Sequence, residues 1–194
     1  MKVIAGKFKG RNLEFRTRRG LRVTSQKVKE AMFSMIGDNI IKAVVLDLFC
    51  GYGTLGIEAI SRGAKEVTFV ETDTHTVKQL KYFLEQLDVA GQATLIRRDA
   101  IKAVKHCKEN SFDIVFMDPP YHINYEEKAL KVVDKYKIIK PGGICILEHY
   151  SKNSIPDRVG DLVKFKEKKY GDTSLSIFEI QPEEVQPDEV QPEE

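Results

Sequence analysis

A glycine-rich turn between an apolar run and a helical pattern constrains this chain more than any other feature. The segment DLFCGYGTLG places Gly51, Gly53 and Gly56 between the apolar run 44–49 and a helix expected to begin at Thr54. Glycine lets the backbone turn tightly and lets a ligand approach it closely. A strand, a glycine turn and a helix in this order predict an α/β fold with a nucleotide-like ligand at the end of that strand.

Short apolar runs alternate with helical patterns along the chain, which is typical of a parallel sheet covered by helices on both faces. A turn at Pro141-Gly142-Gly143 leads into the last of five expected buried strands, which are 44–49, 66–71, 93–97, 113–118 and 143–149. Helices are expected over 54–62 and 74–88. Segments 162–170 and 173–180 predict an antiparallel hairpin. The fold class expected is a Rossmann-like α/β sheet.

The chain is long enough for one sizeable core, and its ends differ from its middle in composition. We expect a basic extension over 1–37, a catalytic α/β domain over 38–180 and a disordered acidic tail over 181–194, where proline recurs every fifth residue. Within the extension, Lys2 to Ala5 and Asn12 to Phe15 predict a small hairpin. Thr24 or Ser25 is then expected to cap a helix that runs to about Ile36.

Positive charge is concentrated near the N-terminus. Residues 1–30 carry ten lysines or arginines and two glutamates, although the net charge of the whole chain is only +2. Such a segment binds polyanions, because each phosphate contact releases counterions. We therefore expect nucleic acid to bind at Lys7, Lys9, Arg11, Arg16, Arg18 and Arg19.

Other features exclude classes of protein. No stretch approaches the roughly 20 apolar residues of a membrane span, and the N-terminus lacks the apolar run of a signal peptide. These features predict a cytoplasmic protein. The three cysteines, Cys50, Cys107 and Cys145, are widely spaced, and no histidine stands at metal-ligand spacing. A disulfide framework or a metal site is therefore not expected.

The acidic residues at strand ends bear on the choice of cofactor. Glu71 ends the strand that follows the glycine turn, where a carboxylate can accept both hydroxyls of a ribose. Asp47, just before the turn, attracts the cationic amino acid end of S-adenosylmethionine and repels a pyrophosphate. Asp99, with Ala100 after it, can accept from an adenine amino group or simply cap a helix. The pattern favours S-adenosylmethionine and leaves an NAD-dependent oxidoreductase as an alternative.

The segment Asp118-Pro119-Pro120-Tyr121 ends the fourth expected strand. Two successive prolines fix the backbone and remove two N–H donors, so the turn presents acceptors. The exocyclic amine of a base is a poor nucleophile, because its lone pair is delocalised. Acceptors at Asp118 and at the Pro119 carbonyl localise that pair, while Tyr121 stacks on the base. The segment predicts methyl transfer to an exocyclic amine of a base, and both guanine N2 and adenine N6 of DNA or RNA fit it.

Several segments together resemble the RsmD-type family of 16S ribosomal RNA guanine-N2 methyltransferases. These are the opening MKVIAGKFKGRNL, the segment from Arg22 to Phe33, the pattern LGIEAISRGA after the glycine turn, and DPPY. The resemblance covers about residues 1–180. It implies a seven-stranded sheet, S-adenosylmethionine as methyl donor, and one guanine of small-subunit RNA as acceptor, within an assembled or assembling ribosomal subunit. A monomer is expected.

The resemblance also implies that Arg22 and Thr24 close over the methionine end of the cofactor. Cys50 and Tyr52 stand where smaller residues are common in the family, so Tyr52 is expected to narrow the cofactor mouth. The full set expected to bind the cofactor is Arg22, Thr24, Asp47, Phe49, Gly51, Tyr52, Gly53, Glu71, Thr72, Asp99, Ala100 and Asp118.

Overall fold

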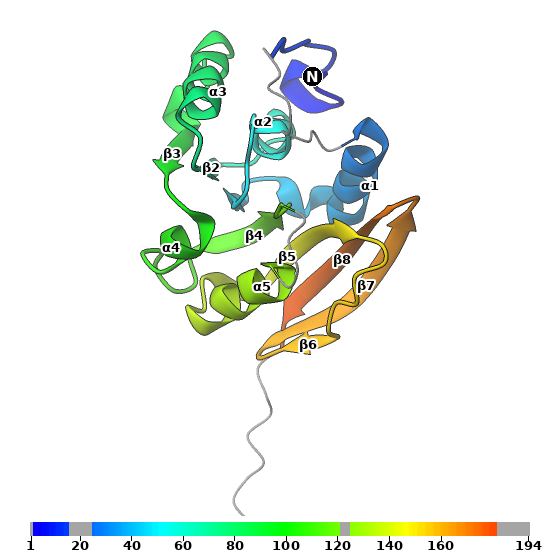
Figure 1. Cartoon of the computed structure of the whole chain (residues 1–194). Coiled ribbons are helices and arrows are strands. Elements are labelled where there is room, and N and C mark those ends of the chain that lie inside the picture. Colours follow the sequence, from blue (N-terminus) through cyan, green and yellow to red (C-terminus); the bar gives the residue numbers. More distant parts are fainter. Residues whose placement is uncertain (1, 16–24, 121–124, 182–194) are drawn as a thin grey trace, which may run out of the picture.

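A computed structural model describes residues 2–15, 25–120 and 125–181 of the chain (Figure 1). One sheet of eight strands runs in the order β3-β2-β1-β4-β5-β8-β7-β6. The strands are β1 (Val44–Asp47), β2 (Glu66–Glu71), β3 (Ala93–Arg97), β4 (Phe112–Met117), β5 (Ile139–Tyr150), β6 (Arg158–Val159), β7 (Leu162–Tyr170) and β8 (Thr173–Ile180).

The Rossmann-like arrangement expected from the sequence is confirmed. β1 to β5 pair in parallel, and the predicted hairpin of β7 and β8 is present, with β8 antiparallel to both β5 and β7. Seven strands match expectation, and the two-residue β6 is the eighth. The prediction of a turn at Pro141 before the fifth strand is wrong. β5 already begins at Ile139, and residues 140–143 form an irregularity where its pairing with β4 shifts register.

Helices cover both faces of the sheet (Figure 1). α1 (Gln26–Ile36), α2 (Thr54–Ser61) and α3 (Thr74–Gln86) lie over one apolar cluster, and α4 (Ala100–Val104) and α5 (Tyr125–Lys135) lie over the other. Short 3-10 turns occupy Gly6–Phe8, Gly37–Ile40 and Ala90–Gln92. None of the helices in the described ranges has the length and apolar character needed to cross a bilayer.

The N-terminal extension packs against α2, and its own pairing is short: the Val3 amide donates to the Arg11 carbonyl and the Gly10 amide donates to the Val3 carbonyl, both at 2.9 Å. A single antiparallel bridge joins Lys2 and Asn12, so the hairpin predicted there is wrong as a pair of strands. The amide of Phe8 instead donates to the Ser61 hydroxyl at 2.9 Å, near the end of α2. The predicted cap of α1 is confirmed at Ser25, whose hydroxyl accepts from the Val28 amide at 3.3 Å.

A buried carboxylate on α2, that of Glu58, holds the extension. It accepts from the amides of Ile4 and Ala5, both at 2.9 Å, and pairs with Lys29 of α1 at 3.0 Å and with Arg62 at 2.9 Å. Glu58 is 0% exposed and Lys29 is 3% exposed. Burial raises the pKa of Glu58, but these donors together outweigh burial and hold that pKa below its usual range.

Replacing this carboxylate should destabilise the protein strongly. Glu58→Ala leaves Lys29 as an uncompensated buried charge, which costs about 3–5 kcal/mol of unfolding free energy. Because the pKa of Glu58 is lowered, this stabilisation is present above the ordinary glutamate pKa of about 4.3 and is lost as the pH falls. Urea unfolding at several pH values measures both effects.

The matched control is Glu85→Ala, because Glu85 forms only an exposed pair with Lys81. Its removal should cost about 0–1 kcal/mol. Equal losses in the two variants would contradict the role assigned to Glu58.

Candidate active site at the carboxyl edge of the sheet

The residues expected to carry chemistry converge at one edge of the sheet. Asp47 ends β1 and lies in register with Phe69 of β2 and Phe116 of β4. Glu71 ends β2, and Asp118 follows the last residue of β4. The chain leaves β1 toward β2 and later returns to β4 on the other side, so a crevice opens at this point, as in other open α/β sheets.

The glycine loop after β1 is held by the strands on either side. The Cys50 amide donates to the Val70 carbonyl at 3.0 Å, and the Gly51 amide donates to the Glu71 carboxylate at 3.1 Å. Gly51 and Gly53 have φ angles of 50° and 73°, which favour glycine. α2 then begins immediately after Gly53. The loop conformation expected from the glycine spacing is therefore present.

Asp47 is buried beneath this loop. It is 3% exposed, and one of its carboxylate oxygens accepts from the Gly56 amide at 2.9 Å. Burial raises its pKa to about 7; the hydrogen bond from Gly56 opposes this rise, and the charges of Asp118 and Glu71 add to it. Three carboxylates therefore lie close enough around the loop to influence one another.

The Glu71 carboxylate is held in place by hydrogen bonds to both of its oxygens, one of which is the bond from Gly51. Its second oxygen accepts from the amide of Thr72 at 2.7 Å, from the Thr72 hydroxyl at 3.1 Å and from the Asp73 amide at 2.9 Å. These donors come from the turn into α3. The carboxylate thus ties the glycine loop to the end of β2 before any ligand binds.

Asp99 caps α4, the second of the two roles that the sequence left open. One oxygen accepts from the Lys102 amide at 3.0 Å, and the other accepts from the Tyr125 hydroxyl at 3.4 Å. The Tyr125 ring lies edge-on to Phe49, with centroids 5.9 Å apart. A contact between Asp99 and adenine stays a prediction. Tyr125 was missed, and only its place at the start of the helix after DPPY could have indicated it.

The ring of Tyr52 is buried against the N-terminal extension. It is 2% exposed and stacks on Phe15 of the extension, with centroids 4.3 Å apart, while Phe15 contacts Phe83 edge-on. Whether this ring also narrows the cofactor mouth stays a prediction. Tyr52 lies within the glycine loop and remains a candidate cofactor contact.

Some of the expected site residues lie outside the described residues. These are Arg22 and Thr24, the RNA candidates Arg16, Arg18 and Arg19, and Tyr121. The other RNA candidates, Lys7, Lys9 and Arg11, are exposed. The segment that carries Lys7 and Lys9 docks on Ser61 at the end of α2 that is remote from the glycine loop. The segment around Lys7 and Lys9 therefore lies away from the glycine loop, whereas Phe15 of the same extension contacts that loop through Tyr52.

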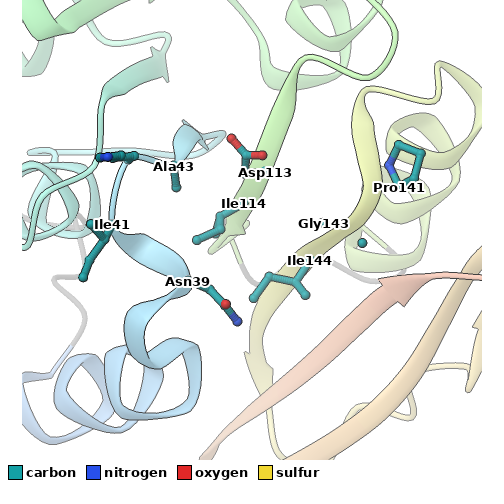
Figure 2. A pocket seen from close by; sticks show the side chains of 10 residues that line it. Asn39, Ile41, Ala43, Asp113, Ile114, Pro141, Gly143 and Ile144 are labelled. Atoms are coloured by element: carbon teal, nitrogen blue, oxygen red, sulfur yellow. The ribbon is translucent and has the colours of Figure 1, made fainter.

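A pocket of about 260 Å³ opens at the opposite edge of the sheet, where β1 and β4 begin (Figure 2). Asp113 lies in its wall, accepts from the Val44 amide at 2.7 Å and pairs with Lys140 at 2.9 Å. Pro141 and Gly142 form another part of the lining. These contacts connect the starts of β1, β4 and β5, so we assign Asp113 a structural role.

The strand order, the glycine loop after β1 and the acidic residue that ends β2 define a class I methyltransferase fold. The chain matches the model of the family described as conserved hypothetical protein 95 over residues 1–179, and it belongs to that family. The expected resemblance to RsmD-type methyltransferases is thereby confirmed, and S-adenosylmethionine is the cofactor.

Individual relatives agree with this assignment. YlbH of Bacillus subtilis is 37% identical over 180 residues, which cover 92% of this chain and 98% of the relative. The ribosomal RNA small subunit methyltransferase D of Haemophilus influenzae is 37% identical over 76% of this chain and 78% of its own length. The structure of yhhF from Escherichia coli, 28% identical, superposes with a TM-score of 0.83 and covers 93% of this chain and 98% of that chain.

Close packing under the glycine loop yields a stability prediction. A Cβ added at Gly56 would lie 2.1 Å from the Phe69 ring, so α2 would have to move off the sheet. Gly56→Ala should therefore cost about 1–3 kcal/mol of unfolding free energy. Gly91→Ala is the control, because a Cβ there meets nothing within 4 Å. Chemical denaturation compares them, and a Gly56→Ala variant as stable as the control would refute the packing argument.

Proposed function

We propose that this methyltransferase transfers a methyl group from S-adenosylmethionine to the exocyclic N2 of a specific guanine in 16S ribosomal RNA. One observation carries the proposal. The carboxylates of Asp47, Glu71 and Asp118 converge around a glycine loop beside a Pro-Pro turn. This arrangement combines a site for a cationic cofactor with a set of acceptors for an amine.

The charge of the site suits the cofactor. When bound, S-adenosylmethionine supplies an electrophilic methyl group on a cationic sulfonium. Asp47 and Asp118 attract that charge, while Glu71 is placed to accept ribose hydroxyls. The same three carboxylates repel a pyrophosphate, which counts against the NAD-dependent oxidoreductase. The other residues of the proposed cofactor set are Phe49, Gly51, Tyr52, Gly53, Thr72, Asp99 and Ala100, together with Arg22 and Thr24, which lie outside the described residues.

The Pro-Pro turn supplies the acceptors for the target base. Pro119 is buried and Pro120 is exposed, and neither has an N–H group that could compete for the Asp118 carboxylate. Asp118 and the Pro119 carbonyl accept from the two N–H groups of the amine and aim its lone pair at the methyl group. As the nitrogen gained the methyl group, the bond from that carbon to the sulfonium would break and release S-adenosylhomocysteine, and Asp118 would take the proton that the nitrogen loses. Tyr121 stacks on the base.

The names of the relatives and the charge of the extension support ribosomal RNA as the substrate. Relatives of this chain carry the name ribosomal RNA small subunit methyltransferase D. The basic residues Lys7, Lys9 and Arg11 are exposed and suit a polyanion. We infer that the protein acts as a monomer on RNA within the assembled or assembling small subunit.

Label transfer tests the proposal directly. Small subunits from a strain that lacks this protein are incubated with the protein and tritiated S-adenosylmethionine, and the RNA is digested to nucleosides. Label in N2-methylguanosine supports the proposal. Label in N6-methyladenosine would replace guanine by the alternative base, and absence of label from RNA would overturn the proposed substrate.

Asp118 should be needed for transfer and not for folding. Asp118→Asn loses the carboxylate that takes the proton, so kcat should fall at least about a hundredfold. Single-turnover assays on small subunits measure the loss, and calorimetry should show that cofactor binding persists. Asp38→Asn, an exposed aspartate before β1, is the control. Retained turnover in Asp118→Asn would remove Asp118 from its assigned role.

Cofactor affinity should depend on the ionisation of Asp47. Its pKa is raised to about 7, so at lower pH the neutral acid dominates and attracts the cofactor less. A cation binds the ionised form better, so affinity should rise as the pH rises through 7. Asp47→Asn should bind more weakly and lose this rise, because an amide does not titrate. Calorimetric titrations across the pH range measure both, and an identical pH profile in the two proteins would contradict the assignment.

A further inference from the structure

The β7–β8 hairpin carries charge that neither the fold nor the proposed site uses. Between Lys164 and Asp172 there are four lysines and two carboxylates. Lys164 already forms salt bridges within the fold, with Asp157 and with Glu167, both at 2.9 Å. The other three, Lys166, Lys168 and Lys169, are exposed, and none of them forms a salt bridge with a carboxylate in the part of the chain that the structure describes.

Two tyrosines accompany these lysines at the carboxyl edge of the sheet. Tyr150 ends β5 and Tyr170 ends β7, and both are in register with Thr173 of β8, which lies between them. The Lys152 ammonium lies 5.7 Å from the centre of the Tyr150 ring, and the Lys168 ammonium lies 5.7 Å from that of Tyr170. Each pair therefore joins a cation to an aromatic ring.

Register places these groups beside the candidate active site. β4 is parallel to β5, and Met117 is in register with Leu147, so Asp118 lies next to Glu148 and two residues before Tyr150 along the strands. The tip of the β7–β8 hairpin thus lies at the same edge as DPPY. The segment that carries Lys7 and Lys9 docks at the far end of α2.

The lysines also share a face with the tyrosines. Lys166 and Lys168 are in register with Ile177 and Leu175, whose side chains belong to the core cluster under α1. Paired residues of neighbouring strands point to the same face. Tyr170 packs against that same cluster. Lys166, Lys168 and Tyr170 therefore lie on one face of the hairpin, while Lys169, in register with Ser174, lies on the other.

We propose that Tyr150, Lys152, Lys166, Lys168 and Tyr170 form a docking surface for the single-stranded RNA that flanks the target nucleotide. The inference rests on the proposed function, because it needs an RNA substrate. Ammonium groups bind phosphates, and aromatic rings stack on unpaired bases without a sequence requirement. The exposed Phe165, at the bulge of β7, adds an aromatic ring next to Lys166 in the sequence.

Edge lysines also have a protective use, since charge on an edge strand prevents pairing with another chain. Beyond Val163, the outer edge of β7 pairs with no strand in the described ranges. The two roles differ in what they predict. If the lysines only protect the edge strand, variants that lack them should aggregate and keep their affinity for RNA. If the lysines bind RNA, the same variants should stay monomeric and lose affinity for RNA.

The test compares the double variant Lys166→Glu/Lys168→Glu with the control Lys105→Glu/Lys108→Glu. The control lysines are exposed and follow α4 at the opposite edge of the sheet, and the change in charge is identical. Binding to small subunits is measured by filter binding at several salt concentrations, and methyl transfer is measured on the same subunits. Lys166→Gln/Lys168→Gln separates loss of charge from repulsion.

We expect the hairpin variant to lose at least about tenfold in affinity for the subunits. The slope of log affinity against log salt concentration should become shallower by about one phosphate contact for each lysine replaced. KM should rise while kcat at saturating subunits stays unchanged. Thermal midpoint and cofactor binding should match the wild type. The glutamine variant should lose less affinity than the glutamate variant.

Equal affinity and salt dependence in the hairpin and control variants would overturn the docking surface, with or without aggregation. That failure is separable from failure of the proposed function. If the wild type labels N2-methylguanosine and the hairpin variant binds like the control, only the docking surface is wrong. If the wild type transfers no label and the hairpin variant still loses affinity, the docking surface stands and the assigned reaction is wrong.

Discussion

The hydrogen bond from the Gly56 amide to the buried carboxylate of Asp47 sets the geometry of the candidate site. It joins the first turn of α2 to the end of β1, and Gly56 itself lies against the Phe69 ring with no room for a side chain. Because α2 is held flat on the sheet, the glycine loop has little freedom. Glu71 restrains the loop from the neighbouring strand. The cofactor therefore meets a loop that is already shaped, which lowers the entropic cost of binding.

A second buried carboxylate connects the basic extension to this framework. Glu58 gathers backbone donors from the extension and cations from α1 and α2, so three parts of the chain depend on one side chain. Phe15 then reaches the glycine loop by stacking on Tyr52. The extension is consequently part of the fold near the cofactor site as well as a carrier of charge. A change at Glu58 can thus reach the glycine loop through Phe15.

Sequence patterns predicted the sheet well and the extension poorly, for physical reasons. Buried parallel strands appear as continuous apolar runs, so β1 to β5 could be placed, whereas the two residues of β6 are too few to show any period. The predicted N-terminal hairpin is reduced to one bridge, because the Glu58 carboxylate accepts from the amides of Ile4 and Ala5 and draws this segment onto α2. That interaction comes from a residue more than fifty positions away.

In the candidate site, too, some features could be predicted from the sequence and others could not. Asp47, Glu71 and Asp118 could be located because the ends of parallel strands meet at one edge. The partners of the aromatic rings lie far away along the chain: Phe15 stacks on Tyr52, and the Tyr125 hydroxyl donates to Asp99 from the start of α5. Their positions follow from tertiary packing, which local patterns do not encode.

The negative charge of the candidate site works against binding of an RNA, and the proposed docking surface on the β7–β8 hairpin offsets this effect. A site lined by carboxylates attracts a cationic cofactor and repels the phosphates of an RNA, over a range of about 8 Å at physiological ionic strength. An RNA can bring a base to Asp118 only if cations beyond that range hold its backbone. The exposed lysines of the β7–β8 hairpin lie at the same edge of the sheet and on a different strand from the carboxylates. In this proposal the carboxylates at the ends of β1, β2 and β4 attract the cofactor, and the lysines of β7 attract the RNA. Because the two sets of charges lie on different strands, strong binding of one ligand does not require weak binding of the other.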